Sequence, residues 1–392
     1  MLRVVKTKSS VDKKEKSLVL FFTRGVSLQH WINSGVLNRE KKIYESLLDK
    51  KVFDKIYWFT YGSDDQDLAK NLYAKNLLDN RIIIVQKNIF YKGKFLEVLY
   101  SFLMIFIHYK IIRVCNLVKT NQINGSWVGL LAKVFLRRPL YLRCGFLLSR
   151  SEKLWNRRSF LAIKLMIYLE KIMFTFCDIS SVTNKGDKEY ILKELKIKNY
   201  PKVINSFIDQ KEFFYFNKDE EEEFLFVGRL SYEKNLINIF KALNKLNLKL
   251  NIIGDGKEKK VLENLAKEIG LDVNFLGVID NLEINNKLNS YKYFILCSLS
   301  EGLPKSLLEA MSAGRICVGT NVPGISSVIQ DGKNGFLSYG LESKDIQIAI
   351  ENAINYPDTE KIRSNSIRYI SNNHSFDKFF IEVRKTIESV MI

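Results

Sequence analysis

The chain has 392 residues, of which 46% are hydrophobic, and it carries 61 Lys and Arg residues against 43 Asp and Glu residues. This length favours two domains over a single core, and the hydrophobic content excludes a disordered chain. Residues 1–200 hold 37 basic and 17 acidic residues, a net charge of +20, whereas the remaining residues have a net charge of −2. The basic half is therefore expected to meet a polyanion: nucleic acid, an anionic membrane surface or a phosphorylated substrate.

The five cysteines form no CxxC pair and mostly lie in apolar runs, which predicts small buried thiols in a reducing, cytoplasmic compartment. Residues 1–17 are polar and basic without an apolar core, which argues against a signal peptide. The most hydrophobic segment, Phe95–His108, contains Glu97 and is shorter than the roughly 20 apolar residues that a spanning helix needs. It predicts a buried helix or one that lies on a membrane surface.

In the first half, short β-branched or aromatic runs alternate with helix-length segments. The predicted strands are Leu18–Thr23, Lys55–Thr60, Arg81–Val85, Arg113–Lys119, Leu140–Arg143 and Asp178–Val182. The predicted helices include Gly35–Leu48, Phe95–Tyr109, Trp127–Phe135 and Ser159–Phe174.

The second half repeats this alternation. Its predicted strands are Phe224–Val227, Lys249–Ile253, Val273–Leu276, Tyr293–Cys297 and Ile316–Gly319. Its predicted helices are Leu236–Leu246, Lys257–Ile269, Leu282–Asn289, Lys305–Met311, Ile346–Ile354 and an amphipathic terminal helix, Asp377–Met391. Apolar strands that alternate with amphipathic helices are typical of parallel sheets covered on both faces, so we expect two doubly wound α/β domains.

Pro201 and a polar run interrupt the periodicity in the segment 199–218, which places the predicted join between domains there. We expect a basic Rossmann-like domain over residues 1–200, a second one over 201–375 and a C-terminal helix over 376–392 that packs across the domains. The acidic patch Asp219–Glu223 is predicted to be a solvated turn.

Ligands of open α/β sheets bind beyond the carboxyl ends of the strands, so the strand-to-helix turns of the second half carry the candidate chemistry. The first turn reads VGRLSYEKN, where Gly228 permits close backbone approach and Arg229 and Lys234 suit a diphosphate. A lysine-rich surface loop would explain the same residues.

Two further turns contain glycine. Gly254-Asp255-Gly256 resembles the start of a dinucleotide fingerprint without its full spacing, and a tight turn is the simpler interpretation. At Gly277-Val278 an open backbone could hydrogen-bond a flat base, although an ordinary loop is the favoured interpretation of this turn alone.

The fourth turn is the stretch SEGLPKSLLEAMSAG, residues 300–314. Pro304 suits the first turn of a helix that Gly314 ends. Glu301 precedes free amides at a positive helix end, and Glu309 follows a turn and a half into the helix. The two carboxylates could bind two hydroxylated parts of one ligand whose phosphates lie between them, whereas a Lys305–Glu309 pair on a solvated face is the structural alternative.

Glu301 and Glu309, separated by seven residues in EGLPKSLLE, resemble the E-x7-E element of glycosyltransferase family 4, whose members are retaining and have the GT-B fold. FVGRLSYEKNL, IIGDGKE, FLGVI and the segment from SEGLPK to GKNGFL are similar to that family in order and spacing, over about residues 203–337. In the first half the resemblance is looser and includes the Arg24-Gly25 turn. The implied architecture is α/β, with two Rossmann-like domains that face each other across a cleft.

The resemblance also implies roles. Arg229 and Lys234 would hold the diphosphate of a nucleotide-sugar donor, Glu309 the ribose hydroxyls and Glu301 the hydroxyls of the transferred sugar. The donor would further be bound around Gly25, Gly228, Gly254, Gly277, Val278, Gly302, Leu303, Pro304 and Lys305.

This sequence departs from the family at two places. Many relatives have a histidine where YLRCG places Arg143, so we name no protein general base and count Arg143 with Arg24 on the acceptor side. Ser327 stands where glutamate is common. No metal is expected: Asp64-Asp65-Gln66-Asp67 is predicted to be a solvated loop, and charge on the leaving diphosphate would be stabilised by cations of the protein. No cofactor beyond the donor, of UDP or GDP type, is implied.

The expected activity is therefore retaining, metal-independent transfer of a sugar to a saccharide or lipid-diphosphate-linked acceptor in bacterial polysaccharide assembly, such as lipopolysaccharide, O-antigen or capsule. The segments Phe90–Arg113 and Arg150–Lys171 could lie on the anionic inner face of the membrane, or be core helices with basic outer faces. A nucleotide-sugar epimerase or hydrolase of the same fold is the alternative. A basic nucleic-acid-binding protein is a remote one, because no recognition motif supports it.

Overall fold

The computed structural model describes residues 15–91, 93–155, 159–216 and 219–391. The basic amino-terminal residues and parts of the segments Arg150–Lys171 and 199–218 lie outside this range. The described chain divides into two compact units. One unit contains the residues up to Lys119, Trp127–Leu140 and Met391, and the other contains Thr120–Ser126 and Tyr141–Val390.

The first sheet, as far as the chain is described, has seven parallel strands in the order β3-β2-β1-β4-β5-β6-β7. Its strands are β1 (Ser17–Phe21), β2 (Lys55–Phe59), β3 (Ile82–Val85), β4 (Leu117–Thr120), β5 (Leu140–Cys144), β6 (Ile179–Val182) and β7 (Lys202–Val203). Six of them match the predicted strands to within a few residues. The two-residue β7 was not predicted, because so short an edge strand has no periodicity to detect.

The helices of this part include two that match predictions closely, α2 (Val36–Asp49) and α6 (Trp127–Leu136). The predicted helix from Phe95 is divided into α4 (Lys94–Ile107) and α5 (Tyr109–Ile112), and α8 (Phe160–Phe176) follows later. Four helices were missed: α1 (Leu28–Asn33), α3 (Asp65–Ala74), α7 (Leu148–Trp155) and α9 (Lys185–Lys193).

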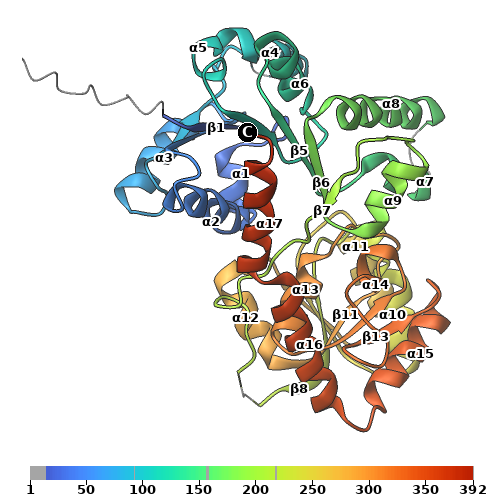
Figure 1. The fold of residues 1–392 in the computed structure, drawn as a ribbon. Helices are drawn as coiled ribbons and strands as arrows, with labels where there is room; N and C mark the ends of the chain where they lie inside the picture. Colours follow the sequence, from blue (N-terminus) through green and yellow to red (C-terminus); the bar gives the residue numbers. More distant parts are fainter. Residues whose placement is uncertain (1–14, 92, 156–158, 217–218, 392) are drawn as a thin grey trace, which may run out of the picture. The chain divides into compact units, whose positions relative to one another are not determined.

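The second sheet belongs wholly to the larger unit and, among the described residues, has six parallel strands in the order β10-β9-β8-β11-β12-β13. They are β8 (Glu221–Val227), β9 (Leu250–Ile253), β10 (Val273–Gly277), β11 (Tyr291–Leu296), β12 (Ile316–Thr320) and β13 (Phe336–Ser338). Every residue of β9 and β12 is buried, because helices cover both faces of this sheet (Figure 1).

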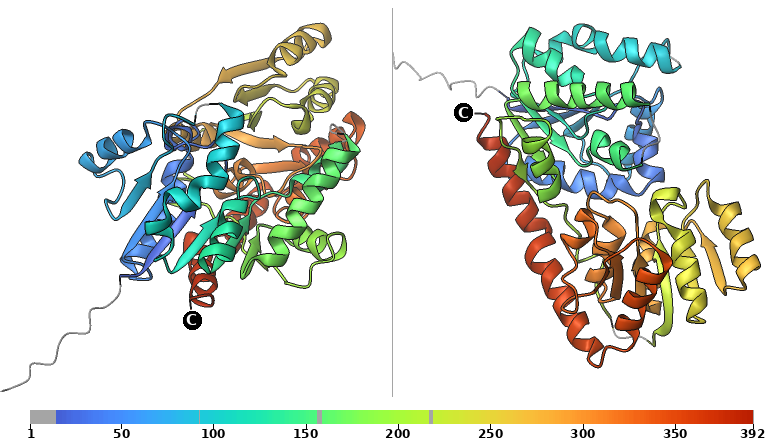
Figure 2. Two further views of the ribbon diagram at one scale, coloured as in Figure 1. Left: turned by 90° about the horizontal axis from the view of Figure 1, so that it is seen from above. Right: turned by 90° about the vertical axis from the view of Figure 1, so that its right-hand side faces the viewer.

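The helical segments around this sheet are η1 (Tyr232–Lys234), α10 (Leu236–Lys245), α11 (Lys259–Ile269), α12 (Asn281–Ser290), α13 (Lys305–Ser312), α14 (Pro323–Ser326), α15 (Ser343–Ile354), α16 (Thr359–His374) and α17 (Phe376–Glu388). Leu307, Leu308 and Met311 of α13 are fully buried in the core of the sheet. Helices α16 and α17 follow one another at the carboxyl end of the chain (Figure 2). Helix α16 was not predicted, since its sequence is mostly polar.

The acidic patch before β8 is not a solvated turn. Glu221–Glu223 open the strand, and the carboxylate of Glu220 accepts hydrogen bonds from the buried guanidinium groups of Arg315 (2.7 Å) and Arg363 (2.5 Å). The prediction was wrong because both arginines lie far along the chain and cannot be paired with Glu220 from local sequence.

The acidic run at Asp64–Asp67 is likewise not a loop, since α3 begins at Asp65. The buried Asp65 carboxylate accepts hydrogen bonds from the backbone N–H groups of Leu28 (2.9 Å) and Gly62 (3.2 Å). Asp65 is therefore a structural residue that ties α1 to the turn after β2.

Candidate functional site

The four turns singled out in the second half of the sequence follow neighbouring strands of the second sheet. Gly277 ends β10, Gly254 follows β9, Gly228 follows β8 and Glu301 lies after β11. Because the strands are parallel and ordered β10-β9-β8-β11, these turns lie side by side along the carboxyl edge. This edge is where open α/β sheets bind their ligands.

Glycine allows the first three turns to approach one another closely. Gly254 has a φ of 139°, and a Cβ atom there would lie 1.9 Å from the carbonyl oxygen of Gly228. A Cβ at Gly256 would lie 2.2 Å from the carbonyl oxygen of Leu230, and the N–H of Gly254 donates to the carbonyl of Gly277 at 2.7 Å. The glycines thus fix the backbone on either side of Arg229.

The two predicted cations differ in their surroundings. Arg229 is exposed, and its guanidinium has no ion-pair partner among the described residues. Lys234 ends the short helix η1, and its side chain is only 16% exposed. A cavity of about 200 Å³, lined in part by Ser231 and Leu299, adjoins this segment. The edge therefore offers one mobile and one fixed cation.

Lys234 pairs with Glu301, although 66 residues separate them in the sequence. The Lys234 Nζ atom lies 2.5 Å from Glu301 Oε1, which also accepts a hydrogen bond from the Ser298 hydroxyl at 2.8 Å. The Glu301 side chain is 13% exposed. The pair joins the turn after β8 to the turn after β11 and holds the carboxylate at the sheet edge.

The turn at Gly302–Lys305 leads directly into α13. Pro304 is the N-cap residue of α13, with φ −73° and ψ 118°, and the helix begins at Lys305. The side chain of Pro304 accepts no hydrogen bond from the first-turn amides, which are donors that a helix cannot pair within itself. Leu303 is half-buried and Lys305 is exposed.

Two residues that the sequence analysis missed shape this turn. A Cβ atom at Gly324, after β12, would lie 2.4 Å from the Glu301 carbonyl oxygen, so only glycine fits there. The Asn184 side-chain amide, at the start of α9, donates to the Gly302 carbonyl at 3.1 Å within the same compact unit. Gly324 follows a predicted strand and could have been found by that rule, whereas the contact of Asn184 has no local signal.

The remaining predicted donor residues are placed as follows. Glu309 lies on α13 and is half-buried. Gly277 has a φ of 73°, a conformation that favours glycine, and Val278 beside it is 78% exposed. An exposed apolar side chain next to an open backbone is a surface on which a flat ring can stack.

The smaller unit has its own cluster at the carboxyl ends of its strands. Gly25, with a φ of 79°, follows β1, and a Cβ there would lie 3.7 Å from Glu97 Oε2. Glu97 pairs with the buried Lys87, which follows β3, at 2.6 Å. Tyr61 follows β2, and burial raises the pKa of its hydroxyl well above the ordinary value. Sequence analysis named Arg24 and Gly25 but missed Tyr61, which directly follows a predicted strand, and Lys87, which lies two residues after another.

Both arginines assigned to the acceptor side lie over aromatic rings. The Arg24 guanidinium carbon is 5.9 Å from the ring centroid of Trp127. Arg143, half-buried on β5, lies 5.2 Å from the ring centroid of Phe379 in α17. Such contacts are worth roughly 0.5–2 kcal/mol.

The histidines and acidic residues show little that suggests proton transfer or metal binding. Burial lowers the pKa of His108 and of His374, and the Nδ1 atom of His374 lies 2.8 Å from the carbonyl oxygen of Ser206. Over the described ranges of the chain, no group of three or more His, Cys, Asp or Glu residues is arranged to hold a metal ion.

Comparison with protein families finds that residues 207–370 match the family described as "Glycosyl transferases group 1". This segment contains Arg229, Lys234, Glu301 and Glu309. The match supports a glycosyltransferase of the group 1 type.

Two named bacterial glycosyltransferases are similar to this chain. An α-1,4-N-acetyl-D-galactosaminyltransferase of Campylobacter jejuni, named for a diNAcBac-PP-undecaprenol-linked substrate, is 30% identical over 53% of this chain and 56% of its own length. The O-antigen biosynthesis glycosyltransferase WbnH of Escherichia coli is 29% identical over 69% of this chain and 76% of its own length. This chain thus spans little more than half the length of the Campylobacter relative.

Solved structures resemble nearly the whole chain. Sucrose-phosphate synthase of Thermosynechococcus elongatus superposes with a TM-score of 0.77 at 17% identity, covering 95% of this chain and 98% of that one. Anabaena HepE in complex with UDP and glucose superposes with a TM-score of 0.74 at 18% identity, covering 95% and 99%. The fold is therefore GT-B, with two Rossmann-like parallel-sheet domains, as predicted.

Proposed function

We propose that this chain is a retaining glycosyltransferase of family 4 that moves a sugar from a nucleotide-sugar donor to a saccharide acceptor without a metal ion. The observation that carries the proposal is the junction of Lys234 and Glu301, which brings a cation and a carboxylate together at the carboxyl edge of the second sheet. Beside them α13 begins at Lys305 after an N-cap proline whose side chain accepts no hydrogen bond from the first-turn amides, and Arg229 adds a second cation. Cations, a carboxylate and free amides on one edge suit a sugar diphosphate.

The donor would lie along this edge. Arg229 and Lys234 would bind the diphosphate, and the first-turn amides of α13 would contribute further donors. Glu309 would bind the ribose hydroxyls, and the base would stack near Val278. Glu301 would exchange its bond to Lys234 for bonds to the hydroxyls of the transferred sugar.

Catalysis would then be electrostatic. The bond between the anomeric carbon and the phosphate oxygen breaks, and the diphosphate leaves with the electron pair, which Arg229 and Lys234 stabilise. The acceptor oxygen bonds to the anomeric carbon on the same face. Its proton passes to the departing phosphate oxygen, so the step balances without a protein base.

The acceptor is proposed to be a lipid-diphosphate-linked saccharide of bacterial polysaccharide assembly, because the Campylobacter relative is named for such a substrate. Arg24 and Glu97, both half-buried at the strand ends of the smaller unit, would offer polar contacts to it, and the buried Lys87 would hold Glu97 in place. UDP is the first donor nucleotide to test, since HepE was solved with UDP and glucose.

A lipid-linked acceptor would bring the protein to a membrane surface on the cytoplasmic side. None of the helices in the described ranges is both long and apolar enough to cross a membrane. Helix α8 nevertheless exposes Phe160, Leu161, Leu165 and Tyr168 at between 59% and 78%, with Lys164 among them. Helix α4 of the smaller unit similarly exposes Phe95, Phe102 and Phe106. Exposed aromatic and aliphatic side chains among lysines are typical of helices that lie in a membrane interface.

The test is a donor screen followed by transfer. We expect one labelled nucleotide sugar to raise the melting temperature, because a ligand that binds only the folded state stabilises it. With a lipid-linked oligosaccharide mixture, that donor should yield a labelled glycolipid, and the anomeric coupling in its NMR spectrum should show retention. Consumption of the donor at the same rate without acceptor would instead identify a hydrolase or epimerase.

A separate experiment tests the membrane surface. Sedimentation with vesicles that contain about one third anionic lipid should capture the protein at low salt, and Leu161→Glu with Leu165→Glu should reduce capture at least tenfold. Equal capture of the variant, or of neutral vesicles, would contradict the proposed surface.

A further inference from the structure

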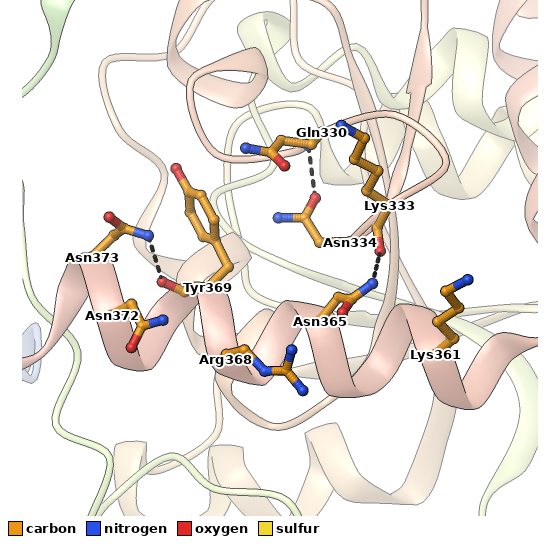
Figure 3. A pocket seen from close by; sticks show the side chains of 9 residues that line it. All are labelled: Gln330, Lys333, Asn334, Lys361, Asn365, Arg368, Tyr369, Asn372 and Asn373. Atoms are coloured by element: carbon orange, nitrogen blue, oxygen red, sulfur yellow. Dashed lines mark hydrogen bonds between the residues drawn. The ribbon is translucent and has the colours of Figure 1, made fainter.

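A cavity of about 470 Å³ in the larger unit is lined by polar and charged side chains (Figure 3). Its walls are α16 and the loop Gln330–Asn334, which leads into the amino end of β13. Because β13 runs parallel to β12, the amino end of β13 lies away from the carboxyl edge that carries Glu301. The volume falls within the roughly 300–1,000 Å³ of typical ligand pockets.

Hydrogen bonds hold the walls together. The side-chain amide of Asn365 donates to the carbonyl of Lys333 at 3.0 Å, and the Tyr369 hydroxyl donates to the carbonyl of Ser327 at 3.0 Å. Within the loop, Asn334 accepts from the backbone of Gln330 at 2.6 Å and donates to the carbonyl of Val328 at 3.1 Å. The cavity therefore has a fixed frame.

The lining is cationic. Lys333 on the loop and Lys361 and Arg368 on α16 all line the cavity, and none of its lining residues is acidic. Over the described ranges, none of these three side chains has an ion-pair partner. Figure 3 shows Lys333 on one wall and the other two cations on the facing helix.

The neighbouring carboxylates are engaged elsewhere. Asp331 accepts from the N–H of Leu337 (2.8 Å) and from the Tyr339 hydroxyl (3.2 Å). Asp358 caps α16 through the N–H of Lys361, and Glu360 pairs with Arg363 at 3.1 Å. Over the described ranges, none of these carboxylates forms an ion pair with Lys333, Lys361 or Arg368.

The rest of the lining consists of carboxamides and one phenol. The side-chain N–H groups of Asn365 and Asn373 donate to backbone carbonyls, and the side-chain oxygens of both residues can accept hydrogen bonds from a ligand. The side chains of Gln330 and Asn372 have no hydrogen-bond partner in the described part of the chain. Carboxamides both donate to and accept from hydroxyl groups. An inorganic anion would accept from the cations and the amide N–H groups, whereas a ligand that carries hydroxyls and a negative charge would also donate to the carboxamide oxygens.

We propose that this cavity binds an anionic saccharide, a sugar that carries a carboxylate or a phosphate, at a site separate from the donor site. This site goes beyond the proposed transfer reaction, because it lies on the other edge of the sheet and needs neither donor nor turnover. It would hold a charged glycan on the enzyme away from the reacting sugar.

Calorimetric titration with matched pairs of probes tests the proposal. Trigalacturonate is compared with neutral maltotriose, and glucose 6-phosphate with glucose. The pair with the larger difference in dissociation constant shows whether the site prefers a carboxylate or a phosphate. We expect one anionic probe to bind at least tenfold more tightly than its neutral partner, because charge-assisted hydrogen bonds are about twice as strong as neutral ones. Saturating UDP should leave this affinity unchanged.

Variants locate the binding. Arg368→Gln and Lys333→Gln should each weaken binding of the anionic probe at least fivefold. Lys344 is an exposed lysine on α15 outside the cavity, and Lys344→Gln should change the affinity less than twofold. All three side chains are exposed, and melting temperatures check that the variants fold. The proposal is overturned if neither anion binds at 10 mM (roughly the millimolar limit of weak binding), if UDP competes, or if the Lys344 variant loses as much affinity as the other two.

Discussion

The ion pair between Lys234 and Glu301 makes the two residues separable by experiment. Each side chain is less than 20% exposed, and the Nζ–Oε1 distance is 2.5 Å. If Lys234 binds the donor diphosphate, Glu301 competes with the nucleotide for the same cation. Replacing Glu301 by Gln should therefore leave nucleotide affinity unchanged or raise it, although it should reduce sugar transfer.

Replacing Lys234 by Met should have the opposite effect on binding. Loss of a charge-assisted hydrogen bond costs about 1.5–3 kcal/mol, which weakens nucleotide binding roughly 10- to 150-fold. In the variant, Glu301 still accepts the hydrogen bond from the Ser298 hydroxyl. Breaking a fully buried pair costs about 3–5 kcal/mol, so the partial exposure here should reduce the loss of folding stability to about 2–3 kcal/mol.

The assay is calorimetric titration of the nucleoside diphosphate that the donor screen selects, on the two single variants and the double variant. Their non-additivity gives the coupling between the side chains. Lys260→Met, an exposed lysine of α11, is the matched control for lost charge. If Glu301→Gln weakens nucleotide binding as much as Lys234→Met does, the two residues act as one unit and the assigned roles are wrong.

Two further predictions concern stability. Burial alone would raise the pKa of the Glu220 carboxyl, but hydrogen bonds from Arg363 and Arg315 outweigh it and lower that pKa below 4.5. The ion pairs of Glu220 with the two arginines therefore stabilise the folded state above pH 4.5, and this stabilisation is lost as the pH falls. Glu220→Gln should lower the free energy of unfolding by about 3–5 kcal/mol at pH 7 and by progressively less in acid. Glu222→Gln, which removes a 74% exposed carboxylate paired with Lys292, should cost less than about 1 kcal/mol, and equal losses in urea titrations of the two variants would contradict the account. Gly254→Ala should lower the free energy of unfolding by roughly 1–3 kcal/mol or more, because the alanine Cβ would overlap the Gly228 carbonyl. The same substitution should weaken nucleotide binding. Gly332→Ala, where a Cβ meets nothing within 4 Å, should cost only about 1 kcal/mol and leave binding intact.

The sequence was most informative where structure is local. Strand runs such as that of β12 are buried on both faces, so unbroken apolar stretches marked nearly every strand, and the turns after β8 to β11 followed from the rule for parallel sheets. What local patterns could not supply was pairing over long separations. Three contacts depend on the tertiary fold in this way: the Lys234–Glu301 ion pair, the ion pairs of Arg315 and Arg363 with Glu220, and the close approach of Gly324 to the Glu301 carbonyl.

The polar cavity on α16 shows the same limit. Helix α16 escaped prediction, so the sequence did not single out Lys361, Asn365 or Arg368. Only the loop that carries Lys333, which packs against α16 through Asn365, turns those side chains into a cavity wall.

The central claim, that the carboxyl edge of the second sheet binds a nucleotide sugar, is tested most directly at Glu309. We measure the dissociation constant of the selected nucleoside diphosphate for Glu309→Gln beside Glu301→Gln. If the Glu309 carboxylate binds the ribose hydroxyls, Glu309→Gln should weaken binding 10- to 100-fold, about 1.5–3 kcal/mol. Glu301→Gln should leave the dissociation constant unchanged or lower it. An unchanged dissociation constant for Glu309→Gln would contradict the account.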